Sequence, residues 1–239
     1  MLSSRMPWDI VLIFFVLGIF VPWRGRAKMR QILAKPRVES SERLSLYAST
    51  IAFQWVAVVI AGWRAWAHGF TSLDLGLVVS DWAAIAALSV IGTALIVVLQ
   101  WLNLRRMGHS SSRFRAPLQA VAERILPQSR MELIPFFALA VTAGVCEEFL
   151  YRGFAMAAFL RWGLPAWIAV VASSLLFGLA HLYQGKSGLA ATTILGLLFG
   201  ATRIVVVSLI PVMCWHIGVD MIAGVAGPKY LITKPDTAD

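Results

Sequence analysis

The sequence is poor in charged residues and in cysteine. Only 14% of its 239 residues are charged, and 12 of these are aspartate or glutamate. A soluble domain of this length needs a far more polar exterior, so that class of protein is excluded. The two cysteines, Cys146 and Cys214, lie in apolar runs without CxxC spacing. This placement predicts two small core residues rather than a disulfide or a metal-binding pair.

Long apolar runs are the main feature that the sequence does have. Hydrophobic residues make up 59% of the chain, and the mean hydropathy is +0.76. Continuous apolar runs are typical of membrane-spanning helices, whereas a transmembrane barrel has short alternating segments. We therefore predict an all-α, polytopic transmembrane bundle that forms one continuous membrane domain. The seven expected spans are residues 8–23, 45–63, 82–102, 132–160, 165–183, 188–202 and 205–225.

The basic residues predict how these spans are oriented. The net charge is +9, and 13 of the 21 lysines and arginines lie in residues 24–44 and 103–130. Positive charge gathers on cytoplasmic loops, so we expect two basic cytoplasmic loops and an N-terminus outside. No nucleic-acid-binding motif accompanies this charge, so nucleic acid is not an expected partner. Only Arg5 precedes the first span, which predicts an uncleaved anchor rather than a signal peptide.

Two adjacent carboxylates and an arginine interrupt the fourth apolar run. Glu147, Glu148 and Arg152 all lie within it. Ionisable groups at membrane depth are costly, and those that occur are usually functional. On a helix Glu148 and Arg152 stand at positions i and i+4, where they can form an ion pair. Glu147 is rotated by about 100° from Glu148, so we expect its carboxylate to be left free for chemistry.

A depth argument links Glu147 to a histidine in the next span. The turn around Leu164 lies 17 residues after Glu147 and 17 residues before His181. In an antiparallel helical hairpin, residues at equal distances from the turn lie at equal depth. We therefore expect Glu147 and His181 to meet, provided that their helix faces agree. A carboxylate beside a histidine can hold a water molecule and remove a proton from it.

The last apolar run adds His216 and Asp220, again four residues apart on one helical face. His216 could donate a hydrogen bond to an oxyanion, with Asp220 orienting it. Together the polar residues favour one joint site over scattered packing groups. A proton path and a metal site remain alternatives. Zinc accepts glutamate and histidine ligands, so a zinc site would use Glu147, Glu148, His181 and His216, although the motif HExxH is absent.

Three motifs, taken in order, resemble the CPBP (Abi) family, which comprises type II CAAX prenyl endopeptidases and bacterial bacteriocin-processing or self-immunity proteins. The motifs are Glu147-Glu148-x-x-x-Arg152, Phe177-x-x-x-His181 and His216-x-x-x-Asp220. The resemblance covers about residues 130–225 and implies an intramembrane endopeptidase with an all-helical core. It implies that Glu147 and His181 activate the water. His216 and Asp220 would stabilise the oxyanion, with Glu148 and Arg152 supporting the site.

The resemblance allows a metal-free, glutamate-dependent mechanism, which we favour, with zinc as the alternative cofactor. In CAAX-processing members the last motif ends in asparagine, where this chain has Asp220. An aspartate only accepts hydrogen bonds unless it is protonated. The alternatives for Asp220 are therefore to orient His216 or to bind a metal.

The domain organisation follows from the same patterns. We expect residues 1–130 to form N-terminal transmembrane helices, residues 131–226 the catalytic core, and residues 227–239 a short polar tail. The expected partners are the lipid bilayer and a peptide or membrane-protein substrate, prenylated or not, in a bacterial cytoplasmic membrane. Two rival functions remain, a non-catalytic immunity or scaffold protein on the same fold and a proton-coupled transporter. Against the transporter, no inverted repeat is visible in the chain.

Overall fold

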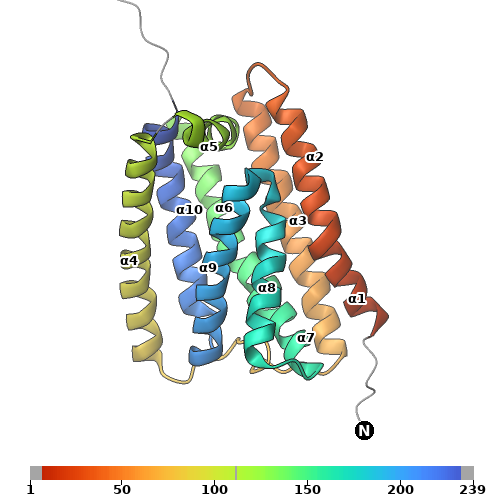
Figure 1. Cartoon of the computed structure of the whole chain (residues 1–239). Helices are drawn as coiled ribbons and strands as arrows, with labels where there is room; N and C mark the ends of the chain where they lie inside the picture. The colour runs from red at the N-terminus through yellow and green to blue at the C-terminus, as the bar shows by residue number, and fades with distance from the viewer. Residues whose placement is uncertain (1–6, 111, 233–239) are drawn as a thin grey trace, which may run out of the picture.

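The computed structural model describes residues 7–110 and 112–232, and within these ranges it contains helices and turns but no strand. Six helices are long and apolar enough to cross a membrane, and a shorter apolar helix, α8 (Ala166–Ala180), joins them. Figure 1 shows them packed side by side as a bundle. The predicted polytopic helical bundle is confirmed, and each of the seven expected spans corresponds to one apolar helix.

The element bounds define the bundle. The first span is one continuous helix made of α1, the π-helical η1 and α2, and the fourth is likewise made of α6, the π-helical η2 and α7. The elements are α1 (Trp8–Phe15), η1 (Val16–Phe20), α2 (Val21–Leu33), α3 (Ser40–Ala67), α4 (Trp82–Gly108), α5 (Ser112–Ile125), α6 (Arg130–Glu148), η2 (Phe149–Ala155), α7 (Met156–Arg161), α8 (Ala166–Ala180), η3 (Leu182–Gln184), α9 (Gly185–Val206) and α10 (Ile210–Leu231).

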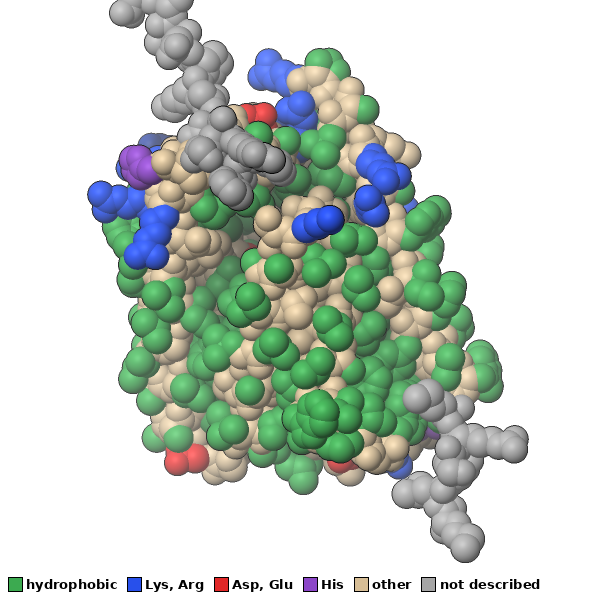
Figure 2. All heavy atoms as spheres, in the orientation of Figure 1, with side chains coloured by type: hydrophobic (Ala, Val, Ile, Leu, Met, Phe, Trp, Pro, Cys, Tyr) green, Lys and Arg blue, Asp and Glu red, His purple; other side chains and the backbone are tan. Residues whose placement is uncertain are grey.

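The two basic stretches differ from the expected loops, because most of each is helical. The first span continues as α2 to Leu33, and residues 112–125 form α5. Helix α5 packs against α10, and Ala122 shares a small buried cluster with Leu104, Ala226 and Leu231. Burial of this apolar face explains why the stretch is a helix rather than a solvated loop. Figure 2 shows the lysines and arginines gathered at the end of the bundle that carries α5, above an apolar band.

The last helix is also longer than expected. Helix α10 runs to Leu231, so its end lies inside the stretch that was expected to be a polar tail. Residues 233–239 of that tail lie outside the described part of the chain. Arg203, near the end of α9, is buried, and its Nη2 donates to the carbonyl oxygens of Leu73 (3.2 Å) and Asp74 (2.9 Å).

A buried ion pair fixes α3 against α6. Arg43 Nη2 lies 2.8 Å from Glu132 Oε1, and Arg43 Nε donates to Glu132 Oε2 at 3.0 Å. Both side chains are buried, and paired bidentate contacts of this kind hold two elements in a defined register. This register matters for the site, because Gln54, farther along α3, faces Glu147 near the end of α6.

The contact between α6 and α10 depends on a glycine. A Cβ atom at Gly144 would lie 3.0 Å from the backbone nitrogen of Ile217 and 3.1 Å from the carbonyl oxygen of Met213. The absence of a side chain lets the two backbones approach closely. Since Glu148 follows Gly144 on α6 and His216 precedes Ile217 on α10, this approach brings the two polar segments together.

We expect Gly144→Ala to lower the free energy of unfolding by about 1–3 kcal/mol, because the added methyl overpacks the α6–α10 contact. Chemical denaturation of the purified protein in detergent would measure this. Gly62→Ala is the matched control, since its Cβ would lie 3.6 Å from Phe149 Cζ, an ordinary contact. Equal stability of the two variants would contradict the role of Gly144.

Candidate active site

The first half of the site is a buried charge cluster around Glu148. As the spacing predicts, Glu148 and Arg152 form an ion pair, with Arg152 Nη1 2.9 Å from Glu148 Oε1. The same oxygen lies 2.8 Å from His216 Nδ1. Glu148 and Arg152 are both fully buried, and the guanidinium lies 4.2 Å from the ring centroid of Phe177. Glu148 therefore joins η2 to α10 through its Oε1, while its Oε2 has no hydrogen-bond partner among the described residues.

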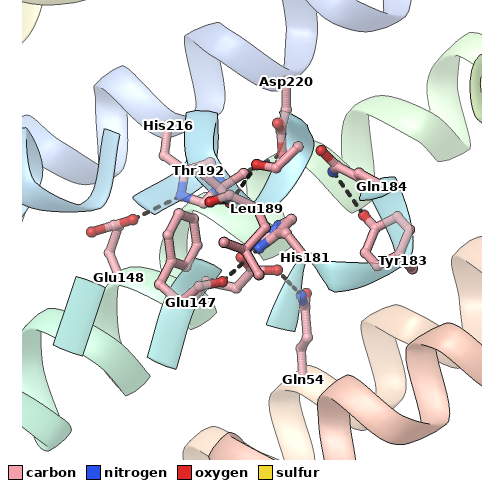
Figure 3. Close-up of polar contacts among 12 residues, drawn as sticks. Gln54, Glu147, Glu148, His181, Tyr183, Gln184, Leu189, Thr192, His216 and Asp220 are labelled. Carbon is pink, nitrogen blue, oxygen red and sulfur yellow. Dashed lines mark hydrogen bonds and ion pairs between the residues drawn. The ribbon is translucent and has the colours of Figure 1, made fainter. Parts of the chain in front are cut away.

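The second half of the site is built on Glu147, which points to different neighbours, as expected from its rotation on the helix. Gln54 Nε2 donates to Glu147 Oε1 at 2.6 Å. Glu147 Oε2 lies 3.8 Å from His181 Nε2, and it has no hydrogen-bond partner among the described residues. The predicted meeting of Glu147 and His181 is thus present in the structure (Figure 3).

A backbone contact orients His181. Its Nδ1 lies 2.9 Å from the carbonyl oxygen of Phe177, one helical turn earlier on α8. A carbonyl oxygen only accepts, so Nδ1 must carry the proton of this hydrogen bond. In the neutral ring the other nitrogen, Nε2, then presents a lone pair toward Glu147.

Phe177 brings the two halves into one site. Its buried ring lies 4.6 Å from the His181 ring and 5.7 Å from the His216 ring, between centroids. The same ring packs in the hydrophobic core of the bundle. On α10, His216 Nε2 lies 3.7 Å from Asp220 Oδ2. Figure 3 shows the labelled polar side chains, which come from α3, α6, the end of α8, η3, α9 and α10.

A cavity lies beside Glu147 and His181, which both line it. Its volume is about 270 Å³, and most of its walls come from α2, α3, α6, η2 and the end of α8, with single residues from η1, α5 and η3. Leu17, Phe53 and Leu150 contribute apolar surface to it. An apolar cleft with a few converging polar groups is the usual form of a substrate site.

The four residues of the zinc alternative are not arranged as a ligand set. Within the described ranges, no group of three or more His, Cys, Asp or Glu side chains is arranged to hold a metal ion. Glu148 Oε1 and His216 Nδ1 are hydrogen-bonded to each other, so neither atom is free to coordinate a metal ion in this arrangement. The zinc alternative stays a prediction, and removal of metal by a chelator tests it.

Gln54 was not predicted from the sequence. It comes from α3, 93 residues before Glu147, and only 8% of it is exposed. The available signal was a lone amide in the apolar run Ala52-Phe53-Gln54-Trp55-Val56. A polar side chain at membrane depth usually has a partner in the bundle, but the spacing does not reveal which partner.

The comparison with known families bears on the segment that carries this site. Residues 129–222 match the family model described as type II CAAX prenyl endopeptidase Rce1-like. The family resemblance predicted from the three motifs is confirmed over this segment. The Rce1-like segment begins at α6, ends in α10 and contains the six ionisable residues of the site, whereas Gln54 and the α2 wall of the cavity lie outside it. No curated protein and no solved structure matches the chain significantly.

The Rce1-like match and the helices together establish the broad class. Six helices that are long and apolar enough to cross a membrane, together with the match to this family over residues 129–222, support an integral, multi-pass membrane protein. At the level of the family, the match supports a protease acting within the membrane on CAAX-type substrates.

The hydrogen bond from Gln54 leads to a prediction about positioning. We expect Gln54→Leu to lower kcat for peptide cleavage about tenfold with little change in KM, because Glu147 loses the donor that fixes its Oε1. The steady-state kinetics of the purified variant would measure both constants. Thr50→Val is the matched control, since Thr50 lines the same cavity but its hydroxyl donates to Leu46. An equal effect of the two substitutions would contradict the prediction.

Proposed function

We propose that this protein is an intramembrane endopeptidase in which Glu147 and His181 activate the attacking water. The substrate is a peptide or membrane-associated protein, prenylated or not, and the protein lies in a bacterial cytoplasmic membrane with its basic end in the cytoplasm. The observation that carries the proposal is the pair of facing acceptors Glu147 Oε2 and His181 Nε2, which lie 3.8 Å apart on two residues that line the cavity.

This spacing suits a water molecule. Glu147 Oε2 and the lone pair of His181 Nε2 are both acceptors, and a separation beyond direct hydrogen-bond range leaves room for a bridging water. One water can donate a proton to each of them. Transfer of a proton to Glu147 leaves a hydroxide that attacks the substrate carbonyl carbon, and the same proton is then delivered to the departing amine. The products are a carboxylate and a free amine.

His216 is the proposed donor to the oxyanion. Its Nδ1 bonds to Glu148, so a hydrogen bond from Nε2 to an oxyanion requires the doubly protonated ring. That cation would lie between the carboxylates of Glu148 and Asp220, which balance its charge. In this proposal Asp220 orients and balances His216 rather than donating to the oxyanion itself, a role that suits an aspartate in place of an asparagine.

The test is cleavage of a reporter peptide library by the purified protein in detergent or nanodiscs, analysed by mass spectrometry. Wild type is compared with Glu147→Gln and His181→Ala, each with and without a strong chelator. The proposal expects loss of cleavage in both variants and no effect of the chelator. Loss on chelation that zinc restores would replace the water-activating pair with a metal centre. Inert wild-type protein, together with variants that still complement a deletion, would favour the non-catalytic scaffold.

A further inference from the structure

Tyr151 is a buried tyrosine whose hydroxyl has no hydrogen-bond partner among the described residues. Only 3% of the residue is exposed. A buried tyrosine hydroxyl usually finds a partner, because an unpaired polar group in a protein core is costly. The hydroxyl oxygen is nevertheless not fully enclosed by protein atoms. Tyr151 lines the cavity, so a molecule bound there can reach this oxygen.

Tyr151 stands one helical turn after Glu147. The two residues are four positions apart, so their side chains lie on one face of the helix that runs from α6 into η2. Helical side chains lean toward the N-terminal end of their own helix, which tilts the long Tyr151 side chain back toward Glu147. The carboxylate of Glu147 interacts electrostatically with Tyr151, but no hydrogen bond joins the two.

The Tyr151 ring is held in place by packing. It meets the Phe177 ring edge-on, with 5.4 Å between the centroids and an interplanar angle of 69°. Phe177 is the same ring that contacts His181 and His216. The hydroxyl of Tyr151 is therefore offered to the cavity from a side chain that is fixed before a substrate binds. Donors that are fixed in this way stabilise the charge that develops in a reaction.

The groups that would hold the water do not bind a substrate carbonyl. Glu147 Oε2 and His181 Nε2 are acceptors in the proposed reaction, and a carbonyl oxygen also only accepts. His216 Nε2 donates only from the doubly protonated ring, as described above. A neutral tyrosine hydroxyl, by contrast, carries a proton that it can donate.

Two other tyrosines line the same cavity, and the hydroxyls of both have partners. The Tyr47 hydroxyl donates to the carbonyl oxygen of Ile125. The Tyr183 hydroxyl accepts a hydrogen bond from Gln184 Nε2 at 3.2 Å. Among the three tyrosines, Tyr151 is thus the one whose buried hydroxyl calls for a ligand.

We propose that the Tyr151 hydroxyl donates a hydrogen bond to the carbonyl oxygen of the scissile peptide bond. This inference rests on the proposed function and adds a catalytic residue to it. Attack of hydroxide on the carbonyl carbon places a negative charge on this oxygen, so the hydrogen bond is stronger in the transition state than in the bound substrate. Tyr151 keeps its proton throughout, and His216 donates to the same oxygen.

The test uses two uncleavable copies of a peptide that the wild-type protein cleaves. In the first copy a phosphinate, with its anionic oxygen, replaces the scissile bond and mimics the tetrahedral intermediate. In the second copy a methylene replaces the scissile carbonyl, so the oxygen is missing. We expect Tyr151→Phe to weaken binding of the phosphinate about 10²-fold, with a similar fall in kcat and little change in KM. Binding of the methylene peptide should not change. Calorimetric titration of the purified protein would measure both affinities.

Tyr183→Phe and Tyr47→Phe are the matched controls, since each removes one hydroxyl from the same cavity. Both are expected to bind the phosphinate as wild type does. Tyr47→Phe should also lower the unfolding midpoint, because it loses the hydrogen bond to Ile125, whereas Tyr151→Phe should keep the wild-type midpoint.

Two results would overturn the role of Tyr151. Equal weakening of both ligands in Tyr151→Phe would mean that the residue only shapes the cavity. Loss of phosphinate binding in Tyr183→Phe, with Tyr151→Phe unaffected, would assign the donor to Tyr183 instead. Wild-type protein that cleaves no peptide would contradict the proposed function itself, so the two kinds of failure are distinguishable.

Discussion

Glu147→Gln is expected to lower kcat for peptide cleavage by about 10³-fold, within the range attributed to a single general base. The amide has almost the same size as the carboxylate, and its oxygen still accepts the hydrogen bond from Gln54. The geometry of the site is therefore retained, but an amide does not take a proton from water. The change isolates the chemical role of Glu147 from its role in packing.

Two measurements make this prediction decisive. The thermal unfolding of the variant in detergent should match that of wild type, which shows that lost activity is not lost folding. Glu39→Gln serves as the control for removal of a carboxylate, since Glu39 is exposed and caps α3 without a side-chain hydrogen bond. Wild-type rates in Glu147→Gln would remove Glu147 from the chemistry and leave the site with a binding or structural role.

The contacts that the sequence predicts are the ones set by simple periodicity. Glu148 and Arg152 are separated by one helical turn, so their pairing needs no knowledge of the fold. The meeting of Glu147 and His181 needs only a hairpin with a short turn between them. Both features depend on distance along the chain, which a sequence displays directly.

The remaining contacts depend on which helices are neighbours. Glu148 meets His216 across 68 residues and Glu147 meets Gln54 across 93 residues. These pairs form only because α6 packs between α3 and α10, and hydropathy does not determine that order. The glycine at position 144 permits part of this arrangement, but its effect is visible only when the backbone of α10 is in place.

The helix Arg130–Arg161 was predictable from the sequence only in part. Its length, about 48 Å for 32 residues at about 1.5 Å each, exceeds a hydrocarbon core of about 30 Å. The sequence therefore predicts that it tilts, bends or projects. The structure adds the π-helical segment η2, immediately after Glu148. Such segments are frequent at functional sites, and here η2 carries Arg152.

The second large predicted effect is a loss of stability, and it arises from the charge cluster around Glu148. Glu148→Ala leaves Arg152 as an unpaired charge in the core, and removing one partner of a buried ion pair costs about 3–5 kcal/mol. The substitution also removes the acceptor of His216 Nδ1. We expect the variant to unfold at much lower denaturant concentration than wild type, or to accumulate poorly.

The double variant Glu148→Leu/Arg152→Met separates the cost of an unpaired charge from the value of the pair. Both charges are removed and apolar side chains take their place, so most of the lost stability should return. Cleavage should not return, because His216 has lost the carboxylate that orients it. Glu42→Ala, which breaks the exposed ion pair with Lys35, is the control and should leave the unfolding midpoint unchanged. If the single and double variants of the buried pair were equally unstable, Glu148 and Arg152 would not be energetically coupled, and the cluster would stabilise the bundle through packing alone.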